Sequence, residues 1–92
     1  MNDPLVKTIE IQNKKGLHAR AASAFVKEVE KFDADFFVEK DGQRVCGTSI
    51  MGLMMLAAAK GSQIKLISKG KDAKQAIEAL TDLINNKFNE EE

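Results

Sequence analysis

Two stretches of this sequence repeat their apolar residues at the period of an α-helix, and this pattern constrains the fold more than any other feature. In the first, which runs from Ala19 to about Phe32, the apolar positions are Ala22, Phe25, Val26 and Val29. In the second, which follows an Asp72-x-x-Gln75 start signal, they are Ala73, Ala76, Ile77, Leu80, Leu83, Ile84 and Phe88. Each pattern predicts a helix with one apolar face that must pack against another element. The chain therefore needs a second layer that covers both helices.

Four segments that alternate roughly between apolar and polar residues predict the strands of that layer. They are residues 5–11, 35–40, 43–47 and 62–68. The pair Asp41-Gly42 favours a β-hairpin, because a tight type I′ turn needs a positive φ at both central residues. A short helix is expected between Ser49 and Gly61. The order β-α-β-β-α-β-α predicts an α+β domain, in which a four-stranded, mostly antiparallel sheet carries the helices on one face.

The 92 residues make one domain, 1–92, and we expect its acidic end, about residues 89–92, to be disordered. A chain of this size can bury a compact core but no large substrate cavity, which favours a site at the surface. Its 14 basic and 14 acidic residues balance, and this argues against binding to nucleic acid or to a membrane. No apolar run reaches the roughly 18 residues of a membrane span. The only cysteine, Cys46, permits no internal disulfide; we expect it to be buried, in a cytoplasmic protein.

His18 is the only histidine, and it stands directly before the first predicted helix in Gly16-Leu17-His18-Ala19-Arg20. The backbone N–H groups of a first helical turn, here those of Ala19 and Arg20, lack partners within the helix and attract anions. The guanidinium of Arg20 suits phosphate oxygens, and Gly16 lets the loop approach closely. Because phosphoryl transfer needs mainly positioning and neutralised charge, His18 is a candidate phosphoryl carrier. On spacing alone, a histidine that caps the helix or lies on the surface is the commoner interpretation.

The charged residues around this candidate site are all basic in the local sequence. Lys14 and Lys15 join Arg20, and no acidic residue lies near them. This favours a local anion site. The acidic residues that close the chain are interpreted as a solvated end: Glu90, Glu91 and Glu92.

Ser49 and the methionines behind it form the second candidate site. As an N-cap residue Ser49 needs no further role, although a phosphate at a helix start is electrostatically acceptable. Leu53 and Leu56 are expected in the core. The remaining apolar side chains would point elsewhere and form a docking patch, or else join the core as methionines often do. These side chains are Ile50, Met51 and Met54.

Three motifs, in this order and separation, resemble the HPr family, the histidine phosphocarriers of the bacterial phosphoenolpyruvate-dependent phosphotransferase system. They are Gly-Leu-His-Ala-Arg (16–20), Ser-Ile-Met-Gly-Leu-Met (49–54) and Ala-Lys-Gly (59–61). The likeness extends from about Leu5 to Phe88. It implies an open-faced β-sandwich with the order βαββαβα, four antiparallel strands and three helices on one face, the middle helix being short.

The resemblance also implies roles for residues and partners. His18 would be phosphorylated on Nδ1 by enzyme I, with Arg20 steadying the phosphoryl group, and would pass it to a IIA domain. Ser49 would be the site of a regulatory HPr kinase/phosphorylase. The patch that docks enzyme I and other partners would include Ile50, Met51 and Met54. The chain would be a monomeric carrier rather than an enzyme, with no cofactor and no metal.

The sequence leaves the biological role of the protein open in several respects. Many relatives have proline where this chain has Ala21, a difference that resembles carriers of proteobacteria, including those of the nitrogen-related branch. Either sugar uptake or a regulatory relay is therefore compatible with the sequence.

A second hypothesis makes the protein mainly a regulator that acts through Ser49 and the Met51/Met54 surface. An RNA-binding module would need aromatic residues on one sheet face, whereas the adjacent Phe36 and Phe37 point to opposite faces.

Overall fold

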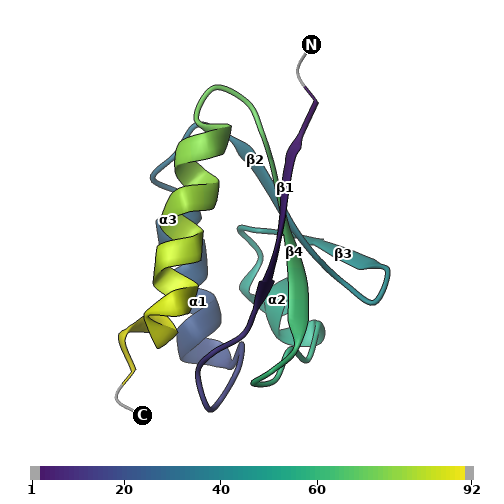
Figure 1. Ribbon diagram of the computed structural model, residues 1–92, viewed down its shortest axis with the longest axis vertical. Coiled ribbons are helices and arrows are strands. Elements are labelled where there is room, and N and C mark those ends of the chain that lie inside the picture. The colour runs from purple at the N-terminus through teal and green to yellow at the C-terminus, as the bar shows by residue number, and fades with distance from the viewer. Residues whose placement is uncertain (1–2, 91–92) are drawn as a thin grey trace.

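The computed structural model describes residues 3–90, which fold into a four-stranded sheet covered by helices (Figure 1). The elements follow one another in the predicted order. They are β1 (Leu5–Glu10), α1 (Ala19–Val29), β2 (Asp35–Lys40), β3 (Gln43–Cys46), α2 (Ile50–Met55), β4 (Gln63–Lys69), α3 (Ala73–Asn85) and the 3-10 turn η1 (Lys87–Asn89).

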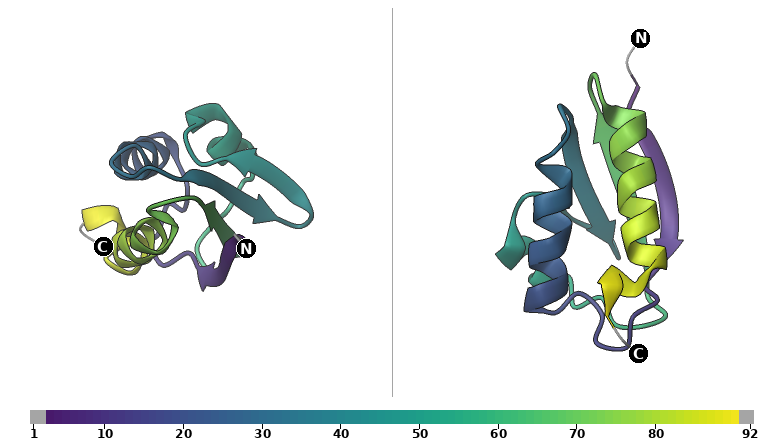
Figure 2. Two further views of the ribbon diagram at one scale, coloured as in Figure 1. Left: turned by 90° about the horizontal axis from the view of Figure 1, so that it is seen from above. Right: turned by 90° about the vertical axis from the view of Figure 1, so that its left-hand side faces the viewer.

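The sheet has the strand order β1-β4-β2-β3, and all three of its pairings are antiparallel. Helices α1 and α3 lie side by side over one face of the sheet, and α2 lies beside α1 near β3 (Figure 2). Phe25 of α1 meets Phe36 of β2 edge to face, with ring centroids 5.8 Å apart. The apolar faces of both long helices are thus buried against the sheet, as predicted, and the α+β class is confirmed.

The hairpin between β2 and β3 also follows its sequence signal. Asp41 and Gly42 have φ values of 51° and 82°, the positive values that a two-residue turn requires. Beyond the turn, however, Cys46 is exposed and the prediction of a buried cysteine is wrong. Its neighbour Val45 packs against the core, so strand alternation turns Cys46 to the uncovered face, opposite Phe37.

Two helix boundaries differ from the predictions. Helix α2 ends at Met55, short of Gly61, and the chain leaves it through Ala57 at a φ of 52°. At the start of α3, the Asp72 side chain makes no cap hydrogen bond. Its Oδ2 instead accepts a hydrogen bond from the backbone N of Asp33 at 2.8 Å, while the N–H of Asp72 donates to the carbonyl of Asp33 at 3.0 Å. Asp72 thus ties the start of α3 to the loop after α1.

The backbone becomes left-handed after α3. Lys87, Phe88 and Asn89 all have positive φ values, between 55° and 63°, and the predicted helical period therefore does not continue to Phe88. Phe88 is still buried, at 7% exposure, and it anchors the turn on the core. The structure describes Asn89 and Glu90, whereas residues 91 and 92 lie outside the described part of the chain, so the expected disorder of the acidic end stays a prediction. Between residues 3 and 90, the helices are too short and too polar to cross a membrane.

Candidate functional site

His18 is the N-cap residue of α1, but its side chain does not cap the helix. Its backbone is extended, with φ −75° and ψ 178°, and its carbonyl accepts the first helical hydrogen bond from Ala22 N at 2.8 Å. The first turn of α1 contains no acidic side chain. The backbone of His18 therefore begins the helix, while its imidazole makes no hydrogen bond to the first turn. The ring stands at a helix start, where unpaired backbone N–H groups favour anions.

The loop that delivers His18 is held tightly against the segment after α2. Leu17 N donates to the carbonyl of Ala58 at 2.9 Å, and Leu17 itself is buried. Gly16 has a φ of +65°, and a Cβ atom there would lie 2.3 Å from the carbonyl oxygen of Ala58. A side chain at residue 16 would therefore collide with fixed backbone, which gives the glycine of the motif a physical reason.

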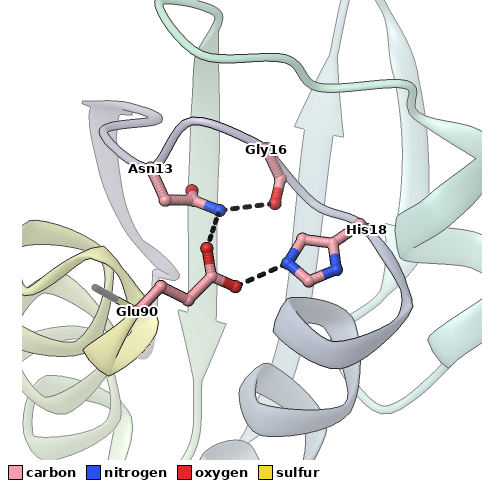
Figure 3. A network of polar contacts seen from close by, with 4 residues as sticks. All are labelled: Asn13, Gly16, His18 and Glu90. Carbon is pink, nitrogen blue, oxygen red and sulfur yellow. Dashed lines mark hydrogen bonds and ion pairs between the residues drawn. The ribbon is translucent and has the colours of Figure 1, made fainter. Parts of the chain in front are cut away.

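A carboxylate from the far end of the chain contacts the histidine ring (Figure 3). Glu90 Oε2 lies 2.5 Å from His18 Nε2, and Glu90 Oε1 accepts a hydrogen bond from Asn13 Nδ2 at 3.0 Å. The same Nδ2 donates to the carbonyl of Gly16 at 2.8 Å. In Figure 3 the second ring nitrogen of His18 faces away from Glu90, beside the start of α1.

Sequence reasoning missed this contact entirely. It placed only basic residues around His18 and interpreted Glu90 as part of a solvated end, whereas the Glu90 side chain is only 12% exposed. The two residues are 72 positions apart. No local signal connects them, because the contact depends on the left-handed turn at residues 87–89 and on the burial of Phe88.

The histidine opens onto a shallow hollow with mixed charge. It is lined by Lys14, Lys15, His18, Arg20, Phe88, Asn89 and Glu90. Arg20 lies on the exposed side of the first turn of α1, close to the ring in sequence and in space. The predicted basic group thus gathers around His18, with one carboxylate added. This arrangement can receive an anion at the surface, where a partner protein can reach it.

The second candidate site, at the start of α2, has the predicted structure. Ser49 Oγ accepts a hydrogen bond from Gly52 N at 2.9 Å, so the serine caps the helix. Leu53 and Leu56 are buried, whereas four neighbours in α2 form an exposed apolar surface, here called the α2 patch. It consists of Ile50 (40% exposed), Met51 (72%), Met54 (42%) and Met55 (66%). Met55 was not singled out from the sequence.

The α2 patch and the histidine are neighbours. His18 and Met54 line one shallow hollow together with Leu17 and residues 57–59. A partner that covers Met54 would therefore also approach the imidazole. Among residues 3–90, no three side chains of His, Cys, Asp or Glu come together in a group that could hold a metal ion.

Comparisons with known proteins show the family of this chain. A family model described as the phosphorylation site of the HPr component of the phosphotransferase system matches residues 5–86. The chain is 53% identical over 88 residues to the phosphocarrier protein HPr of Neisseria meningitidis serogroup A, and the match covers 96% of this chain and 99% of that relative.

Solved structures give the same relationship. The crystal structure of HPr from Thermoanaerobacter tengcongensis matches with a TM-score of 0.91 at 49% identity, over 96% of this chain and 99% of that one. Crh, a catabolite repression protein of Bacillus subtilis, matches with a TM-score of 0.74 at 43% identity, over 86% and 91% of the two chains; that structure is a dimer with a swapped domain.

Proposed function

The chain belongs to the HPr family, the phosphocarriers of the phosphotransferase system, and we propose that His18 is the residue that carries its phosphoryl group. One observation carries this proposal: the His18 ring stands at the start of α1 without capping it, in a surface hollow with Arg20. Backbone N–H groups and a guanidinium can therefore meet a phosphoryl group on the ring.

The transfer needs no acid or base from other residues of the chain. The lone pair of Nδ1 attacks the phosphorus of phosphorylated enzyme I, an Nδ1–P bond forms, and the bond between phosphorus and the donor atom of enzyme I breaks with its electrons going to that atom. The backbone N–H groups of Ala19 and Arg20, with the Arg20 side chain, neutralise charge on the phosphoryl oxygens. Transfer to a IIA-type acceptor is the same exchange in reverse. The carrier is thus a covalent intermediate, and its partners supply the remaining catalytic groups.

The α2 patch is the surface that we assign to partner docking. Its side chains Ile50, Met51 and Met54 are exposed, and Met54 shares a hollow with His18. Flexible apolar methionines suit a surface that must accept several partners in turn. These partners also imply a cytoplasmic location for the chain. The monomeric state expected from the sequence stays a prediction, since the related Crh forms a swapped dimer.

Ser49 is proposed as a regulatory phosphorylation site for an HPr kinase/phosphorylase. Its Oγ caps α2 and lies at the edge of the α2 patch, beside Ile50. A phosphate at this position would remain compatible with the helix start but would add negative charge next to the docking surface. Docking of an acidic partner surface would then become weaker, through repulsion and desolvation.

A second candidate function keeps the fold but makes the chain mainly a regulator that acts through Ser49 and the Met51/Met54 surface. The likeness to Crh favours it. The two functions differ in their need for the histidine. A His18→Ala variant that still binds its partners and still exerts its regulatory effect would identify the regulator, whereas loss of phosphoryl relay in that variant identifies the carrier.

Intact-mass measurement after incubation with enzyme I and phosphoenolpyruvate tests the carrier proposal. We expect one added phosphoryl group that is lost in acid, the same product with Ser49→Ala, and none with His18→Ala. Unmodified wild-type protein in the presence of active enzyme I would contradict the proposal, as would acid-stable phosphate that persists in His18→Ala.

A further inference from the structure

We propose that Glu90 is a positioning residue for His18: its carboxylate holds the Nε2–H of the ring and so leaves Nδ1 as the nitrogen that receives the phosphoryl group. This inference rests on the proposed carrier function and adds to it a residue from the opposite end of the chain.

The contact distances carry the first step. A carboxylate oxygen can only accept a hydrogen bond, and Glu90 Oε2 lies 2.5 Å from Nε2. Nε2 must therefore hold the proton in this pair. A neutral imidazole has a single ring proton, so Nδ1 then keeps its lone pair. An acidic partner that fixes the tautomer of a functional histidine in this way is common at metal sites, where the ring nitrogen that is not hydrogen-bonded does the chemistry.

The position of the carboxylate is itself fixed by its second oxygen. Asn13 is fully buried, and its Nδ2 donates both to Glu90 Oε1 at 3.0 Å and to the carbonyl of Gly16 at 2.8 Å. Both acceptors are oxygens, so the amide must present its NH₂ group to them. Asn13 thereby connects Glu90 to the loop that delivers His18, and Figure 3 shows this continuous network.

The Glu90 carboxylate and the incoming phosphoryl group also lie at different positions around the ring. Glu90 occupies the Nε2 side of the ring, whereas the second nitrogen faces the start of α1 (Figure 3). During transfer the Nδ1–P bond forms, the bond between phosphorus and the donor atom breaks with its electrons going to that atom, and the proton stays on Nε2, hydrogen-bonded to Glu90. The ring need not turn, and the two negative groups lie at different edges of the imidazole.

The test compares Glu90→Gln and Glu90→Ala with Glu78→Gln. Glutamine has both a donor and an acceptor at its end, and alanine has neither, so both changes release the tautomer. Glu78 lies exposed in the middle of α3, and its change alters the net charge equally. For each protein, ¹⁵N shifts of the His18 ring report the tautomer, and single-turnover phosphorylation by enzyme I reports the rate.

We expect the wild type and Glu78→Gln to show Nε2–H with an unprotonated Nδ1. In both Glu90 variants the ring should shift toward the tautomer mixture of free histidine, and phosphorylation should slow by about 10- to 100-fold, the range known for second-shell partners of histidine ligands. Both variants should keep the wild-type amide spectrum outside the site, because residue 90 follows the last helical turn.

The outcomes separate the two proposals. A wild type that accepts no phosphoryl group would overturn the carrier function itself. A wild type that accepts it, with Glu90 variants of unchanged rate, would overturn the role of Glu90 alone. Slower transfer with an unchanged tautomer would overturn that role too, because the effect would then not act through Nε2.

Discussion

Helices α1 and α2 begin in different ways, although both N-cap residues have extended backbones. At α2, Ser49 Oγ accepts a hydrogen bond from Gly52 N, so the side chain completes its own helix. At α1, the His18 side chain makes no cap hydrogen bond and instead contacts Glu90, 72 residues away. The Ser49 side chain serves its own helix, whereas the His18 side chain is held by a residue from the far end of the chain.

The two N-cap residues therefore differ in whether the fold alone explains their identity. The capping role of Ser49 explains why a serine stands there, and its proposed phosphorylation is a further use of a residue that the fold already needs. His18 has no such structural reason. A Ser, Thr, Asp or Asn at this position would serve α1 better, so the histidine is explained by the chemistry of its ring.

The largest expected difference in stability between the two helix starts comes from substituting the glycine near each of them. Gly16→Ala forces a Cβ to within 2.3 Å of the Ala58 carbonyl at a positive φ, and we expect the free energy of unfolding to fall by about 3 kcal/mol or more. The matched change is Gly52→Ala in α2. There a Cβ would lie 3.0 Å from Ser49 Oγ and from Val45 Cβ, which is crowded but meets no backbone atom. Higher helix propensity offsets part of this crowding, so we expect a smaller loss of about 1 to 2 kcal/mol. Urea unfolding measures both, and equal losses would contradict the tight loop at α1.

A change at Arg20 should act on transfer rather than on stability. Arg20→Gln removes the cation beside the ring, and a charge-assisted hydrogen bond to a phosphoryl oxygen is worth about 1.5 kcal/mol or more. The single-turnover rate of phosphorylation by enzyme I should therefore fall roughly tenfold. Lys27→Gln, which removes a cation from the last turn of α1, is the control and should leave the rate unchanged. A normal rate in Arg20→Gln would remove the guanidinium from the proposed mechanism.

Alanine at each N-cap tests the comparison directly. Ser49→Ala loses the hydrogen bond to Gly52 N and should lower the free energy of unfolding by about 1 kcal/mol, while His18 still accepts phosphate. His18→Ala removes no cap bond but does remove the hydrogen bond to Glu90, so we expect a loss of similar size, about 1 kcal/mol, together with complete loss of phosphorylation. Urea unfolding and intact mass measure the two effects. The contrast fails if His18→Ala still accepts phosphate or if Ser49→Ala does not.

The smallest expected change in stability is that of Ser49→Asp. Aspartate caps helices about as well as serine, so the free energy of unfolding should stay within about 0.5 kcal/mol of the wild type. The added charge lies beside the α2 patch and should weaken binding of enzyme I, which isothermal titration calorimetry can measure. Thr48→Asp places the same charge one residue earlier and controls for net charge. Unweakened binding in Ser49→Asp would contradict the proposed regulation by charge.

Local patterns in the sequence predicted most of the fold, because they depend on neighbours along the chain. Helical and strand periods identified the elements and the buried Phe25, Leu66 and Leu80, and Asp41-Gly42 identified the hairpin. The same local reasoning failed for Asp72, which matches a capping motif but bonds to Asp33 instead. It also failed for Cys46, because alternation at an edge strand turned it outward.

The sequence by itself determined the order of the elements, the place of His18 before α1 and the cap at Ser49, since each is decided within a few residues by backbone geometry and apolar periodicity. Only the tertiary structure decided what surrounds the histidine. Glu90 reaches Nε2 only because the chain turns left-handed after α3 and buries Phe88. The buried Asn13 then donates a hydrogen bond to the same carboxylate. Contacts between residues so far apart arise from packing of the whole core, which no local pattern encodes.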